Sequence, residues 1–164
     1  MKRFLFVVSL LALCLLLSQS SFAQPPTATQ TVSFVVNAVS KISVDADPPA
    51  LTITEGTAGV DALTAVGDSS TSYSITHNNA APLSITAQIA STMPSGVNLQ
   101  IKLYSTKGTT SGHVDISSAT TAVNVVTGIA RGADANQQIA YILGANASAG
   151  TVSDSRVVTL TLTP

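Results

Sequence analysis

Residues 83–89 read LSITAQI and residues 97–103 read VNLQIKL, so apolar and polar side chains alternate along both stretches. A period of two places the apolar side chains on one face of a β-strand. One buried face and one wet face are typical of antiparallel sheets. Residues 93–96, which read MPSG, carry Pro and Gly between the two stretches and predict a turn. This part of the chain therefore predicts two strands of an antiparallel sheet.

Similar alternation recurs on both sides of this region, with turn residues between the stretches. Further strands are predicted around Val32, Phe34 and Val36, Ile42 and Val44, Leu51 and Ile53, Tyr73 and Ile75, Val123 and Val125, Ile139, Tyr141 and Leu143, and Val158, Leu160 and Leu162. The polar, glycine-containing stretch from Thr106 to Thr121 predicts a long loop or an irregular sheet edge. We expect an all-β fold, a single antiparallel immunoglobulin-like β-sandwich of about seven or eight strands.

The N-terminus has the pattern of a secretory signal peptide. Lys2 and Arg3 precede an apolar run over residues 4–17, and Ser21 and Ala23 are small residues at the −3 and −1 positions. A run of about 14 residues is short for a membrane span. We therefore predict a signal peptide over 1–23 with cleavage after Ala23, a flexible leader over 24–30 and the β-sandwich domain over 31–164.

The predicted mature chain has neither cysteine nor a basic patch. The one cysteine, Cys14, falls in the apolar run, so no disulfide is expected after cleavage. Five basic residues stand against eight acidic ones in residues 24–164, a net charge of −3. This balance argues against nucleic-acid binding and against attraction to an anionic membrane. Four scattered aromatic residues make a sugar-binding platform an unfavoured interpretation.

Candidate catalytic groups are few. The two histidines are His77, in a predicted hairpin loop, and His113, which lies two residues before Asp115 in a glycine-flanked loop. Serines are plentiful, but no Gly-x-Ser-x-Gly elbow is present. We predict no catalytic residue, no cofactor-binding residue and no enzymatic activity.

Metal binding is also weakly supported. Two isolated histidines without cysteines make a poor zinc site. Asp45 and Asp47 can offer oxygen ligands to calcium, but their spacing does not fit an EF-hand loop. We favour a role for this pair in ending a strand, predict no metal site and leave weak calcium binding as the alternative.

Two stretches resemble known families. Residues 149–162, AGTVSDSRVVTLTL, are similar to the closing strand of spore-coat-U-like and related bacterial pilin subunits. Residues 73–86 are similar to a hairpin of bacterial immunoglobulin-like surface modules. The resemblance implies that subunits of this kind polymerise. This chain departs from many such pilins in lacking the disulfide and in carrying Val152 where an aromatic residue is common.

These observations favour a non-catalytic structural domain that is secreted or held at the cell surface. A terminal strand at a sheet edge can accept a strand from another subunit, and the first strand, behind its flexible leader, can act as the donor. The expected partners are other copies of the chain or surface proteins, with no membrane span in the mature chain. The alternative is an extracellular module that binds a glycan or a protein through the loops around His77 and Thr106–Thr121.

Overall fold

The computed structural model describes residues 25–164, and the predicted signal peptide over 1–23 lies outside the described residues. The chain divides into one unit that ends at Val35 and a second unit, Val36–Pro164, that contains all the strands of the described residues. The strands are β1 (Ser40–Val44), β2 (Val66–His77), β3 (Leu83–Ile89), β4 (Val97–Leu103), β5 (Thr109–Thr110), β6 (Val114–Asp115), β7 (Val123–Ile129), β8 (Gly132–Ala145) and β9 (Val158–Thr163).

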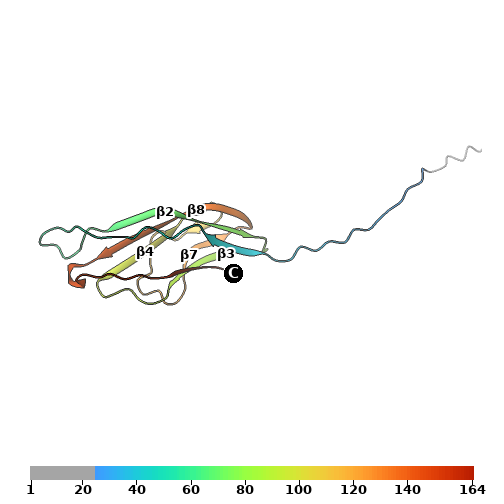
Figure 1. Ribbon diagram of the computed structural model, residues 1–164. Coiled ribbons are helices and arrows are strands. Elements are labelled where there is room, and N and C mark those ends of the chain that lie inside the picture. Colours follow the sequence, from blue (N-terminus) through green and yellow to red (C-terminus); the bar gives the residue numbers. More distant parts are fainter. Residues whose placement is uncertain (1–24) are drawn as a thin grey trace, which may run out of the picture. The chain divides into compact units, whose positions relative to one another are not determined.

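The strands form two antiparallel sheets, which confirms the predicted all-β sandwich. One sheet has five strands in the order β1-β2-β8-β4-β6, and the other has four in the order β5-β7-β3-β9. Figure 1 labels β2, β8 and β4 of the first sheet and β7 and β3 of the second. The long strand β8 lies between β2 and β4 and pairs with both of them. Since β8 comes late in the chain, the five-stranded sheet joins segments that are distant in sequence.

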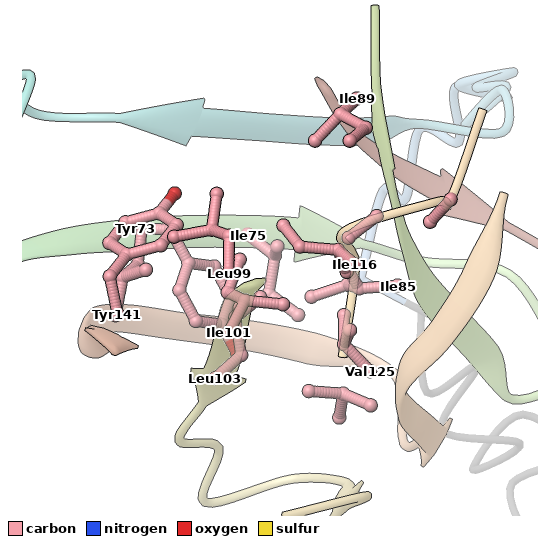
Figure 2. Close-up of a cluster of buried hydrophobic side chains, with 14 of the residues drawn as sticks. Tyr73, Ile75, Ile85, Ile89, Leu99, Ile101, Leu103, Ile116, Val125 and Tyr141 are labelled. Carbon is pink, nitrogen blue, oxygen red and sulfur yellow. The ribbon is translucent and has the colours of Figure 1, made fainter. Parts of the chain in front are cut away.

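Period-two alternation explains how the core forms between the sheets. In β3 every second residue from Leu83 to Ile89 is buried, as the pattern of that stretch predicts. Tyr73, Ile101 and Tyr141 from the five-stranded sheet pack in one cluster with Ile85 and Val125 from the four-stranded sheet (Figure 2). Fully burying an aliphatic or aromatic side chain of this size contributes roughly 1.5–3 kcal/mol. The core therefore holds the sandwich together without cysteines.

Two of the predicted strands do not form. Residues 31–36 have no strand pairing, although Val32, Phe34 and Val36 alternate with other residues as in a strand. Leu51 and Ile53 are half-buried but also lie outside any strand. Alternation selects a face for burial, whereas a strand also needs a neighbouring backbone with free hydrogen-bonding groups.

The stretch from Thr106 to Thr121 is more ordered than a simple loop. It contributes the two-residue strands β5 and β6, which extend one edge of each sheet. Ile116 is fully buried in the core cluster, and Ala119 is buried with it. The segment thus forms irregular sheet edges, one of the two predicted alternatives, and it also contributes two buried residues that the polar pattern did not indicate.

Helix is nearly absent from residues 25–164, where the three-residue 3-10 helix η1 (Ala147–Ala149) is the one helical element. No helix of the described residues has the length and apolar character needed to cross a membrane.

Candidate functional site

The structure does not bring the predicted histidine candidates into a catalytic arrangement. His77 is the last residue of β2 rather than a loop residue, and it is 1% exposed. Its Nε2 lies 3.1 Å from the carbonyl oxygen of Ala130, and its Nδ1 has no hydrogen-bond partner in the described part of the chain. A histidine buried in this way is not available for binding at a loop surface.

The second histidine lies beside β6. The neighbouring Asp115 accepts hydrogen bonds from the backbone N–H of Ser117 at 2.8 Å and from the Ser117 hydroxyl at 2.5 Å. Among the hydrogen bonds of residues 25–164, none joins Asp115 to His113. The sequence neighbours His113 and Asp115 therefore form no charge-relay pair.

The acidic pair Asp45 and Asp47 follows β1, as predicted for residues that end a strand. The Asp45 carboxylate accepts hydrogen bonds from the backbone N–H of Ser72 at 2.8 Å and from its hydroxyl at 2.9 Å. These hydrogen bonds lower the pKa of Asp45. No group of three or more His, Cys, Asp or Glu side chains in residues 25–164 is placed to hold a metal ion.

Asp134, which the sequence analysis did not single out, is the one buried carboxylate of the described chain. It accepts hydrogen bonds from the Ser105 hydroxyl at 2.9 Å, from the Thr106 N–H at 2.9 Å and from the Thr106 hydroxyl at 2.7 Å. Burial opposes ionisation, but these hydrogen bonds outweigh it, and the pKa of Asp134 is lowered. All of its partners hold the turn after β4, so the arrangement is structural.

A hollow of about 470 Å³ lies where β4 and β8 meet the loop before β2. Its lining is small or neutral, and none of the lining residues has a titratable side chain. Asn98 and Asn146 are the polar side chains of this lining. The hollow therefore offers amide groups but no acid, base or nucleophile.

The most unusual surface is the apolar segment before β1. Val32, Phe34 and Val36 are 74%, 86% and 79% exposed. Val35 is 85% exposed as well, so the exposed apolar side chains are contiguous from Phe34 to Val36. Contiguous exposed apolar side chains are typical of a surface that contacts another chain. We call residues 31–36 the N-terminal apolar segment.

The sheets have four edges, and they differ in how well they are protected from pairing with another chain. β5 and β6 are two residues long, and β1 carries Lys41, a charge of the kind that discourages edge-to-edge pairing. β9 is six residues long, pairs with β3 on one side and has no charged residue and no proline. Its inward residues Leu160 and Leu162 are half-buried. β9 is thus the longest edge strand without a charged residue or a proline, and β1 of the other sheet lies near it.

The comparisons with known proteins assign no family. No protein-family model matches the chain, and no curated protein matches it. The functional interpretation therefore depends on the exposed segment and the open edge.

Proposed function

We propose that this chain is a non-catalytic structural subunit, exported to the cell surface or the medium, that assembles with other copies of itself by strand pairing. The observation that carries the proposal is the exposure of Val32, Phe34 and Val36 in a segment that has a strand pattern but no strand partner. In the assembly, the N-terminal apolar segment of one copy adds to the free edge of β9 in the next copy.

The energetics favour such pairing. Each valine or phenylalanine that moves from water into a packed site contributes roughly 1.5–3 kcal/mol. Pairing also satisfies the backbone groups along β9, which an isolated edge leaves to water. Burial of three side chains is then large enough to offset part of the entropy lost on association.

The N-terminal apolar segment is long enough to span β9, since it contains six residues and β9 has six. Three apolar side chains of the N-terminal segment correspond to the three inward side chains of β9, Val158, Leu160 and Leu162, which pack only partly against the core. An added strand would cover these three half-buried side chains of β9. Because each copy has one donor and one acceptor, the contact is head-to-tail and generates a fibre unless it closes into a ring.

The absence of cysteine from residues 24–164 permits a direct test by disulfide cross-linking. Val35 lies between Phe34 and Val36, so in a paired strand its side chain points away from the core, as does the exposed Thr161 of β9. Cross-strand neighbours have Cβ atoms about 4.5–5.5 Å apart, close to disulfide geometry. We expect a donor with Val35→Cys to form an oxidised dimer with a tagged acceptor that carries Thr161→Cys or Thr159→Cys. These two acceptor positions are successive outward-facing residues of β9, so each one tests a different register of the paired strands.

Two controls define the result. Phe34→Ser in the donor removes the largest apolar side chain of the segment and should weaken cross-linking strongly. An acceptor with Ser118→Cys presents a thiol on an exposed loop and should give only background dimer. Size-exclusion chromatography and electron microscopy of the cysteine-free exported chain should show concentration-dependent oligomers or fibres. A strict monomer at high concentration, without cross-linking to β9, would refute the proposal.

A further inference from the structure

The base of the N-terminal apolar segment is held by a single side chain. β1 pairs with β2 up to the pair Ser40 and His77, and Asn78 is the next residue after β2. The backbone N–H of Asn78 donates to the carbonyl oxygen of Val39 at 3.1 Å. Its side chain then accepts from the Val39 N–H at 2.7 Å and donates to the carbonyl oxygen of Asn37 at 2.9 Å. One residue therefore binds three backbone groups of the incoming chain.

The Asn78 amide takes the place of the next residue of a β-strand. A side-chain amide has one acceptor and two donors, so it can imitate the C=O and N–H groups that a neighbouring strand presents. Here it continues the hydrogen bonding of β1 back to Asn37, although β2 itself has ended and the chain turns toward β3. The hydrogen-bonded part of the chain thus begins three residues before β1, although these residues have no strand partner.

The neighbouring asparagine makes a different contact. Asn79 donates to the hydroxyl of Ser40 at 3.0 Å, so it binds a side chain within β1 and no backbone group before it. The two adjacent asparagines lie in the same loop, but only Asn78 bonds residues upstream of β1. This difference supplies a matched control.

We propose that Asn78 is a positioning residue for assembly, which fixes the point from which the N-terminal apolar segment leaves the domain. This inference rests on the proposed function, because it concerns the donor strand of that assembly. A segment anchored at Asn37 has fewer conformations to lose on pairing than one that is free back to Ser40. Ordering the backbone of a residue costs conformational entropy, so prior anchoring favours association.

The inference makes a prediction that depends on which copy carries the change. Asn78→Ala should reduce the affinity of the copy that donates its N-terminal segment about tenfold, the equivalent of losing one or two net hydrogen bonds. The same variant in the copy that offers β9 should have no effect. Asn78→Asp keeps the acceptor for Val39 but loses the donor to Asn37, so its effect should be intermediate. Asn79→Ala should leave assembly unchanged.

The experiment places each variant in turn in the Val35→Cys donor or in the Thr161→Cys acceptor and measures the concentration dependence of cross-linking. A loss confined to the Asn78→Ala donor supports the inference, because general destabilisation would impair both roles. An equal loss in both roles, or no loss in the donor, overturns the inference and leaves the proposed function intact. Absence of cross-linking between the parent donor and acceptor overturns the proposed function itself.

Discussion

The carboxylate of Asp134 accepts two hydrogen bonds from Thr106, one from the backbone N–H at 2.9 Å and one from the hydroxyl at 2.7 Å. Asp134 is in β8, and Thr106 is in the turn that follows β4. The contact therefore attaches a surface turn to the central strand of the five-stranded sheet. Because the carboxylate is buried, its removal leaves donors without partners.

We expect Asp134→Asn to lower the free energy of unfolding by about 1–3 kcal/mol at pH 7, since a buried hydrogen bond to a charged group is lost. The folded-state pKa of Asp134 lies below the ordinary value of 3.8. The stabilisation is therefore present above that ordinary value and disappears as the pH falls through the lower folded-state pKa. Denaturant unfolding across pH 2–7 should show the two proteins converging in acid.

Asp47→Asn, at an exposed position, is the control and should leave the unfolding curve nearly unchanged. Parallel pH profiles of wild type and Asp134→Asn would contradict the prediction.

We expect the ionisation of Tyr73 to destabilise the folded protein in alkali. Burial is the largest cause that raises its pKa to about 12, and the nearby Asp134 charge adds to it. Its hydroxyl donates to the carbonyl oxygen of Tyr104 at 2.6 Å. The folded state holds this proton more tightly than the unfolded state, so stability should fall as the pH rises from about 10 to about 12.

Tyr73→Phe should cost about 1 kcal/mol at pH 7, because the carbonyl of Tyr104 loses its donor. It should also reduce the alkaline loss of stability measured by denaturant unfolding. Burial raises the pKa of Tyr141 to about 12 as well, so part of the alkaline dependence should persist in this variant. If the stability of Tyr73→Phe depended on pH as that of the wild type does, Tyr73 would not be a cause of the alkaline loss of stability.

The strands that form were predictable where alternation coincides with at least one neighbouring strand in the sheet. β3 and β4 follow the sequence pattern closely, since one face of each is buried along its length. The same pattern failed at residues 31–36, which have the alternation but no partner within the described chain. Local sequence indicates which face can be buried, whereas pairing is decided by distant segments.

Polar stretches hid other features. β8 begins at Gly132, earlier than Ile139, where apolar alternation begins, because Asp134 and its polar neighbours do not have a strand pattern. The buried Ile116 is isolated among polar residues, so no periodicity marked it. Asn78 gave no signal either, since asparagine in a loop is ordinary and its role depends on a segment about forty residues away.

The turn after β4 leaves no room for a side chain at Gly108. A Cβ atom there would lie 2.7 Å from Ile129 Cγ1, 2.8 Å from Val126 Cγ1 and 2.9 Å from the carbonyl oxygen of Thr127. Gly108→Ala should destabilise the fold by about 1–3 kcal/mol, as overpacking does. Thermal unfolding measures this loss, and Thr109→Ala, at the exposed neighbouring position, should have little effect in that experiment. Equal stability of both variants would show that β7 can shift at no cost.

Arg156 stabilises the segment that leads into β9. Its guanidinium donates to the carbonyl oxygens of Ser91 and Thr92, and it forms a salt bridge with Asp154 at 2.6 Å. Arg156→Ala should lower stability by about 1–2 kcal/mol, since several charge-assisted hydrogen bonds are lost together. It should also accelerate hydrogen exchange in β9 more than in β4.

Arg156→Lys keeps the charge but not the planar fork that reaches two carbonyls, so we expect it to recover only part of the loss. Full recovery by lysine would mean that charge alone holds the start of β9.

The position of β8 between β2 and β4 has a consequence for biosynthesis. β2 and β4 emerge from the ribosome before their shared partner, which is complete only at Ala145. Until then β2 can pair only with β1 and β4 only with β6, so the two halves of the five-stranded sheet remain separate. The five-stranded sheet therefore cannot be completed until most of the polypeptide has been synthesised.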